Sequence, residues 1–82
     1  MSSPPKILQR ILSGTADSNI PFADLIHLLS HLGFKLRVQG SHHIFTKEGI
    51  ADRINVQREG SKAKPYQIKQ VRRILLANPD IR

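Results

Sequence analysis

Apolar residues recur at helical spacing in two stretches of the N-terminal third of the chain. The first runs from Pro4 to Leu12 and is predicted to be a short amphipathic helix, stopped by Ser13-Gly14. A polar connector follows at residues 14–19. The second helix is predicted to begin near Pro21, with Asn19 or Ile20 as its cap, and to end at Gly33. Its apolar stripe consists of Leu25, Ile26, Leu28, Leu29 and Leu32.

After Gly33 the pattern changes to strict alternation, which is typical of a strand. Phe34, Leu36 and Val38 are expected to face the core, and Lys35, Arg37 and Gln39 to face outward. The result would be a half-buried strand with a basic outer face. Gly40-Ser41 suits a type II′ hairpin turn, because glycine is favoured at its first central position. A returning strand is then predicted from His42 to Lys47.

The C-terminal half continues the sheet and closes with a helix. Glu48-Gly49 is a predicted turn, Arg53 to Gln57 a third strand, and residues 58–64 a basic, flexible loop. A last helix is expected from Pro65 to Asn78-Pro79. The fold class is therefore α+β: a single domain over residues 1–82, with a three-stranded antiparallel sheet backed by helices.

Positive charge is concentrated in the second part of this sequence. The net charge is +7, and residues 1–34 contribute nothing to it, because Lys6 and Arg10 balance Asp17 and Asp24. All of the excess lies in residues 35–82, which favours a polyanionic partner, with nucleic acid before an acidic protein or a membrane surface. Basic charge also serves solubility alone, and this explanation stays open.

Other features narrow the location and the chemistry. The chain has no cysteine, no apolar run long enough for a membrane span and no secretion signal at its start, so a cytoplasmic protein is expected. Its glycines form no phosphate-binding pattern, and its acidic residues form no obvious catalytic pair. His27 and His31 have a zinc-compatible spacing but lack a third ligand. We therefore expect neither a metal nor a cofactor.

The adjacent histidines His42 and His43 are the remaining candidates for chemistry. Neighbours on a strand point to opposite faces, so the two rings cannot share one site, and one of them is expected to be structural. An imidazole exchanges protons near neutral pH, and RNA supplies its own nucleophile in the 2′-hydroxyl. From these residues alone, a catalytic histidine and an ordinary polar hairpin both remain open.

Residues 32–45, Leu-Gly-Phe-Lys-Leu-Arg-Val-Gln-Gly-Ser-His-His-Ile-Phe, resemble the HicA family of toxin endoribonucleases. The segments 53–57 and 64–72 fit the strand and closing helix of that family, and the resemblance covers residues 20–77. Residues 1–18 would be a helical extension. The resemblance implies a double-stranded-RNA-binding-domain-like fold, metal-independent cleavage of mRNA and neutralisation by a HicB-type antitoxin. It places the catalytic histidine at His42, with His43 as the second choice.

The basic residues around this segment are expected to hold the RNA backbone. They are Lys35, Arg37, Arg58, Lys62 and Lys64. Gly40 and Ser41 would set the turn that aims His42, and Tyr66, a lysine or water could be the complementary acid or base. Two alternatives use the same residues without catalysis: a double-stranded-RNA-binding module, and a basic domain that docks an acidic protein.

Overall fold

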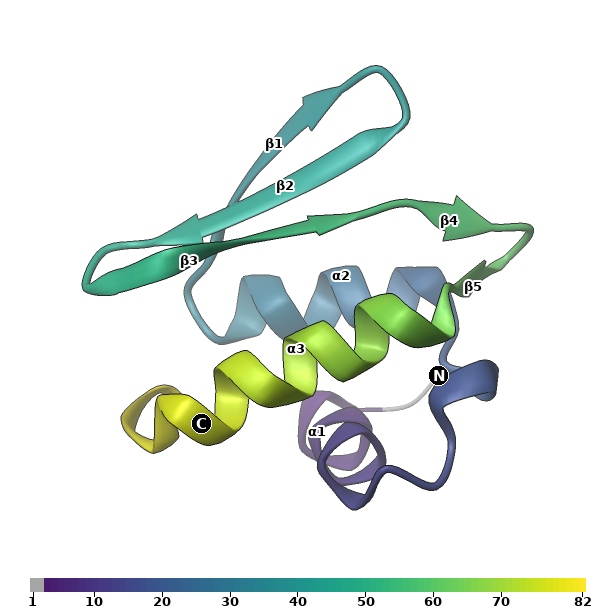
Figure 1. The fold of residues 1–82 in the computed structure, drawn as a ribbon, viewed down its shortest axis with the longest axis horizontal. Coiled ribbons are helices and arrows are strands. Elements are labelled where there is room, and N and C mark those ends of the chain that lie inside the picture. The colour runs from purple at the N-terminus through teal and green to yellow at the C-terminus, as the bar shows by residue number, and fades with distance from the viewer. Residues whose placement is uncertain (1–2) are drawn as a thin grey trace.

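A computed structural model describes residues 3–82 and shows three α-helices and a three-stranded antiparallel sheet (Figure 1). The predicted α+β class is confirmed. In chain order the elements are α1 (Pro4–Ser13), η1 (Asp17–Asn19), α2 (Phe22–His31), β1 (Lys35–Gln39), β2 (His42–Lys47), β3 (Ile50–Val56), β4 (Arg58–Glu59), β5 (Lys62–Ala63), α3 (Pro65–Ala77) and η2 (Pro79–Ile81).

Prolines and glycines fix where the helices begin and end. Pro4 and Pro65 occupy the first turns of α1 and α3, where a missing N–H costs nothing. Pro21 is the N-cap residue of α2, whereas the sequence predicted Asn19 or Ile20 at that position. Gly33 follows α2 with a φ of 93°, and a Cβ there would lie 2.6 Å from Lys47 Nζ. The positive φ favours glycine at the point where the chain turns from α2 into β1, and the flexible end of the Lys47 side chain would have to move to admit a Cβ.

The sheet has the order β1-β2-β3, and its first hairpin has the predicted turn. Gln39 pairs with His42, which leaves Gly40 and Ser41 as the two loop residues. Gly40 has a φ of 57° and Ser41 does not have a positive φ, the combination that a type II′ turn requires. The third strand begins earlier than predicted, at Ile50, because the chain reverses tightly at Glu48-Gly49.

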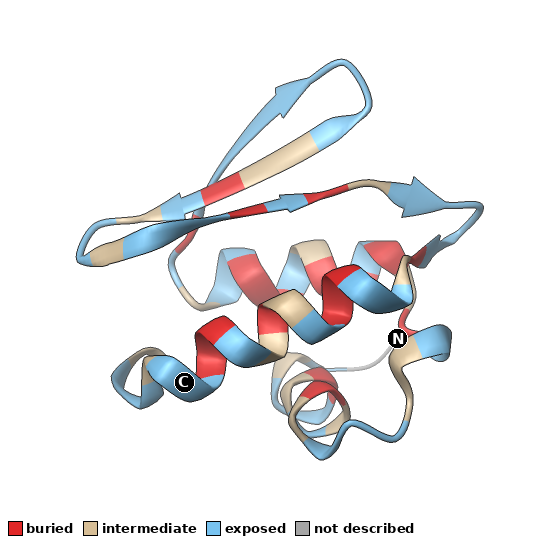
Figure 2. Ribbon diagram, in the orientation of Figure 1, coloured by how far each residue is buried: buried red, intermediate tan, exposed pale blue. Residues whose placement is uncertain are grey.

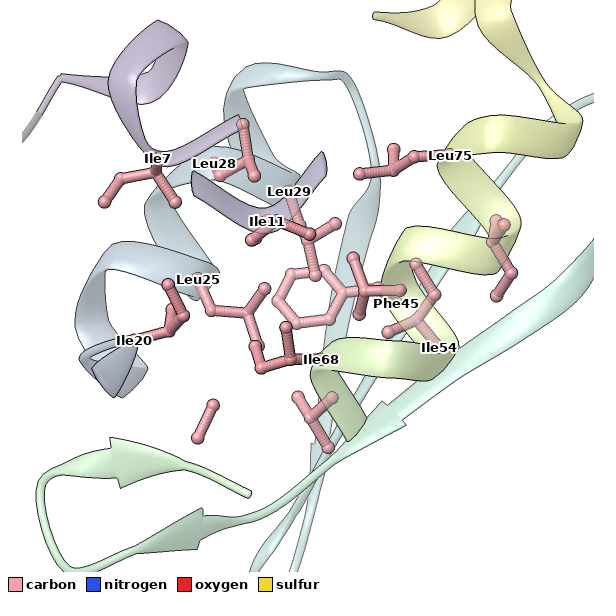
Figure 3. Packing of buried hydrophobic residues seen from close by; sticks show 14 of the residues in the cluster. Ile7, Ile11, Ile20, Leu25, Leu28, Leu29, Phe45, Ile54, Ile68 and Leu75 are labelled. Carbon is pink, nitrogen blue, oxygen red and sulfur yellow. The ribbon is translucent and has the colours of Figure 1, made fainter. Parts of the chain in front are cut away.

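The core lies between the sheet and the helices. Figure 1 shows α2 and α3 beneath the sheet, with α1 on the far side of both. Phe45 and Ile54 extend from the sheet towards Leu29, Ile68 and neighbouring apolar side chains of the helices (Figure 3). Figure 2 shows the buried positions on the facing sides of these layers. The N-terminal extension takes part in this core, since Ile7 and Ile11 of α1 are fully buried.

Strand β1 is where it was predicted, but the expected half-burial is wrong. All five of its residues are exposed, including Leu36 at 43% and Val38 at 54%. These two side chains do share the face of Phe45, because Leu36 pairs with Phe45 and Val38 pairs with His43. The reason for their exposure is position: β1 is an edge strand, and its hairpin with β2 rises away from the helices (Figure 1).

Residues 58–64 were predicted to be a flexible loop, and this prediction is wrong. They form the β4-β5 hairpin, in which Arg58 pairs with Ala63. The hairpin is tied to the start of α2 and to the segment before it: Phe22 N–H donates to Ser61 O at 2.9 Å, and Ala63 N–H donates to Ile20 O at 2.9 Å. These bonds to distant residues order a stretch that has no strong strand pattern of its own.

A salt bridge joins the N-terminal extension to α3. Arg72 donates from Nη1 to Asp17 Oδ1 at 2.8 Å and from Nη2 to Oδ2 at 3.0 Å. Arg72 Nη1 also donates to Ile11 O at 3.0 Å. The hydrogen bonds from Arg72 hold the pKa of Asp17 below its ordinary value of 3.8. A carboxyl group whose pKa is lowered by folding stabilises the fold while it is ionised.

Replacing Asp17 with Asn should therefore lower the free energy of unfolding by about 1 kcal/mol at neutral pH. The difference should shrink as the pH falls below the ordinary carboxyl pKa and through the lower folded-state pKa, since the wild-type carboxylate then becomes protonated. Urea unfolding of both proteins at neutral and at acidic pH measures it. A difference that is the same at both pH values would contradict this assignment.

Candidate active site and nucleic-acid interface

His42 is the first residue of β2 and is exposed to solvent. The Gly40-Ser41 turn presents its ring on the sheet face that is turned away from the helices. Nδ1 of His42 lies 3.0 Å from Asn55 Oδ1, and Nε2 lies 3.4 Å from Gln57 Nε2. The same Gln57 amide donates to Ser41 Oγ at 2.9 Å. The side-chain amides of Asn55, on β3, and of Gln57, just after β3, thus contact the two ring nitrogens of His42.

The register of the sheet places basic residues on the same face as His42. Arg37 pairs with Ile44, and Ile44 pairs with Asn55, so these three side chains form a row beside the imidazole. Lys35 pairs with Thr46 and lies one row further on. We call this face, with its residues Lys35, Arg37, Gln39, His42, Ile44, Thr46, Arg53 and Asn55, the outer face.

A hollow lies on the outer face next to His42. It has a volume of about 380 Å³ and is lined by Arg37, Gln39, Ile44, Thr46 and Arg53. Over residues 3–82 the one ion pair is that of Arg72 with Asp17. The guanidinium groups of Arg37 and Arg53 therefore keep their charge free for an anion, and the hollow suits a phosphate-bearing strand.

His43 lies on the opposite side of the sheet, as strand geometry predicts. Its ring packs edge-on against Phe22, with centroids 4.9 Å apart and an angle of 79°. Its Nδ1 is buried and has no hydrogen-bond partner in the part of the chain that the structure describes. This environment is structural, so the geometry favours His42 over the second choice, His43.

The remaining predicted RNA-binding residues form a separate group on and beside the β4-β5 hairpin. The Arg58 guanidinium lies 5.1 Å from the centroid of the Phe22 ring, a cation–π contact. Lys62 Nζ donates to Asn19 Oδ1 at 3.0 Å, and Lys64 is the N-cap residue of α3. Tyr66 follows in the first turn of α3 and is 63% exposed. The structure thus splits the predicted cations into two groups, and the outer-face group shares its surface with His42.

Comparison with known proteins decides the family. The model of the HicA toxins of bacterial toxin–antitoxin systems matches residues 22–76 of the 82 in the chain. The chain belongs to the HicA toxin family. Its core from α2 to α3 has the double-stranded-RNA-binding-domain-like order of helix, three strands and helix. The curated proteins and the solved structures that were searched gave no match.

Membership makes this HicA protein a toxin that acts with a partner antitoxin protein. The family match begins at Phe22, and α1 and η1 lie before it in the chain. No helix within residues 3–82 is long and apolar enough to cross a membrane. The same residues contain no cluster of three or more histidine, cysteine or acidic side chains with the geometry of a metal site.

Sequence reasoning missed four residues of the candidate site. They are Arg53, Asn55, Gln57 and Gln67, whose Oε1 accepts a hydrogen bond from Gln57 N–H at 3.0 Å. The alternating pattern of the third strand indicated part of this site. Ile54 and Val56 were predicted to face inward, so Arg53 and Asn55 should face outward. Which of them would approach His42 depends on the register between β2 and β3, and the sequence does not specify that register. Gln67 lies on α3 and gave no signal at all.

Proposed function

We propose that this HicA toxin is an endoribonuclease that cleaves mRNA in the cytoplasm, with His42 as its general acid/base. The observation that carries the proposal is the position of His42: an exposed imidazole beside a hollow lined by two arginines that form no ion pair within residues 3–82. We further propose that its partner is a HicB-type antitoxin, which would stop cleavage by covering the outer face.

The chemistry needs few protein groups, because RNA carries its own nucleophile. His42 accepts the proton of a ribose 2′-hydroxyl, and the 2′-oxygen forms a bond to the adjacent phosphorus. The bond from phosphorus to the 5′-oxygen breaks, and this oxygen takes up a proton from the protonated imidazole or from water. The products are a 2′,3′-cyclic phosphate and a 5′-hydroxyl. Cations near the phosphate stabilise the charge of the transition state.

The other site residues would bind and position the substrate. Gly40 and Ser41 set the turn that aims His42. Lys35 and Arg37, together with Arg53, would hold the RNA backbone along the outer face. Arg58, Lys62 and Lys64 would provide a second contact near the start of α3. Tyr66, a lysine or water would supply the complementary proton.

A second candidate function is binding of double-stranded RNA without cleavage. It is favoured by Lys64, the N-cap residue of the 13-residue helix α3, where backbone N–H groups and the helix dipole favour phosphate. Lys62 lies two residues earlier, on β5, and adds positive charge nearby. Here His42 would only donate or accept a hydrogen bond. The third reading, a basic domain that docks an acidic protein, requires neither binding nor cleavage of RNA.

One experiment separates these functions. Wild type and His42→Ala are incubated with RNA in EDTA, and cleavage and binding are measured in parallel. Cleavage by the wild type alone, with binding by both, supports the nuclease. Binding without cleavage by either protein supports the RNA-binding module. If the wild type neither binds nor cleaves RNA, only the protein-docking function remains. An RNA with a 2′-deoxyribose at the cleaved position should resist the wild type.

Removing Arg37 and Arg53 should weaken RNA binding and flatten its salt dependence. Each lost phosphate contact should reduce the slope of log K against log salt by about 0.7 for a single strand. The double variant Arg37→Ala/Arg53→Ala is compared, by titration at several salt concentrations, with Lys69→Ala/Arg73→Ala. This control has the same charge change on exposed positions of α3. Equal salt slopes for the two double variants would show that RNA contacts another surface than the outer face.

A further inference from the structure

The hydrogen bonds around His42 are compatible with one form of the neutral ring. The side-chain oxygen of Asn55 can only accept, so at 3.0 Å it requires a hydrogen on Nδ1 of His42. Nε2 then carries the lone pair. The Gln57 amide nitrogen has two hydrogens, and it directs one to Ser41 Oγ at 2.9 Å and the other to Nε2 at 3.4 Å. In this arrangement each of the three contacts pairs one donor with one acceptor.

We propose that Asn55 is a positioning residue that fixes neutral His42 in the Nδ1–H tautomer and so leaves Nε2 as the proton acceptor. Free histidine side chains favour the opposite form, with the hydrogen on Nε2. Asn55 reverses this preference by accepting the Nδ1 hydrogen, and Gln57 supports it by donating to Nε2.

Gln57 is itself held in place by a buried glutamine of α3. Gln67 is only 3% exposed, and its Oε1 accepts a hydrogen bond from Gln57 N–H at 3.0 Å. Gln57 follows Val56, which pairs with His43, and its side chain lies beside His42. The contact with Gln67 fixes the backbone at this point, just after β3 ends. The buried side chain of Gln67 thus anchors the backbone of the residue whose side-chain amide contacts His42.

The tautomer matters for catalysis, a consequence that rests on the proposed nuclease function. A ring with its hydrogen on Nε2 cannot accept the 2′-hydroxyl proton at that nitrogen. Once Nε2 has taken the proton, Nδ1–H still donates to Asn55, whose carbonyl oxygen then stabilises the positive ring. Gln57 must release Nε2 at this stage, because two N–H groups would otherwise face each other.

The tautomer can be measured directly by nuclear magnetic resonance of ¹⁵N-labelled protein in mildly alkaline solution, where imidazoles are neutral. We expect Nδ1 of His42 to show the shift of a protonated nitrogen and Nε2 that of an unprotonated one. His27 and His31, exposed on α2, serve as internal references for an unconstrained ring. The reverse assignment for His42 would overturn the proposal. It would mean that the side-chain amides of Asn55 and Gln57 are rotated by 180°, so that Asn55 donates to Nδ1 and Gln57 accepts from Nε2.

Variants of Asn55 test the cause. Asn55→Leu removes the acceptor and should return His42 to the tautomer of the reference histidines, whereas Asn55→Asp keeps an acceptor and should preserve Nδ1–H. Gln9→Leu, on the exposed side of α1, controls for loss of an amide elsewhere. Amide spectra of each variant check the fold. An unchanged tautomer in a folded Asn55→Leu protein would exclude Asn55 as its cause.

Cleavage assays of the same proteins distinguish this inference from the proposed function. Asn55→Leu should lower kcat by at least about tenfold, but by no more than the loss of the whole acid/base, which is ~10²–10⁴-fold. KM should change little. If the wild type has the expected tautomer but does not cleave RNA, the nuclease proposal fails and the positioning role of Asn55 stands. If it cleaves RNA with the reverse tautomer, only the positioning role fails.

Discussion

Replacing His42 with Ala should lower the rate of RNA cleavage by about 10²–10⁴-fold, the usual value of general acid–base catalysis. RNA affinity should change little, because the contacts proposed for the backbone come from cations on the outer face and near α3. The fold should also survive, since the ring is exposed and, among the residues that the structure describes, forms side-chain hydrogen bonds only to Asn55 and Gln57. Single-turnover rates at saturating protein, measured in EDTA, give the chemical step directly.

The matched control for this substitution is His27→Ala. His27 is an exposed imidazole on α2, outside the outer face, so its removal should leave cleavage intact. In cells, expression of the wild type and of His27→Ala should arrest growth, and His42→Ala should not. A His42→Ala protein that cleaves RNA at the wild-type rate would rule out the assigned acid/base.

His43→Ala should have a different effect from His42→Ala. The His43 ring packs against Phe22 from the inner side of the sheet, where the buried Nδ1 has no contact with solvent. Its loss should therefore lower stability, and cleavage by the molecules that remain folded should persist. Measuring thermal unfolding and cleavage for both variants distinguishes the structural role of His43 from the proposed catalytic role of His42. The sequence predicted only that the two rings face opposite sides of the sheet.

Local patterns predicted most of the elements of this HicA chain. Apolar spacing located α1, α2 and α3, and alternation located β1 and β2, because these signals depend only on neighbouring residues. The Gly40-Ser41 turn was predicted in type as well as in place, since the positive φ at Gly40 is a local requirement. The position of His42 at the start of β2 follows from that turn. The choice of His42 over His43 as the candidate residue came from the resemblance to the HicA family.

Long-range pairing accounts for what the sequence did not show. The β4-β5 hairpin depends on bonds from Ser61 and Ala63 to residues about 40 positions away in the chain, such as Phe22 and Ile20. The exposure of Leu36 and Val38 depends on how far the helices reach under the sheet edge. In the same way, the contacts of Asn55 and Gln57 with His42 depend on strand register, which alternation alone leaves undetermined.

Ile11→Ala should lower the free energy of unfolding by about 2–5 kcal/mol, although Ile11 lies outside the segment that matches the family. Its side chain has 0% exposure, and α1 packs against both α2 and α3. Small domains have a total stability of only about 5–15 kcal/mol, so this loss would be a large part of it. Urea unfolding compares the variant with Gln9→Ala, an exposed position on the same helix that should cost far less.

The consequence for function follows from the layers of the fold. Helix α1 lies on the far side of α2 and α3 from the sheet (Figure 1), whereas His42 lies on the outer face of the sheet. At a temperature where Ile11→Ala remains folded, its cleavage rate should therefore match that of the wild type, and only its unfolding midpoint should fall. A loss of less than about 1 kcal/mol would mean that the core closes without the extension, because burial of an isoleucine side chain is worth about 1.5–3 kcal/mol.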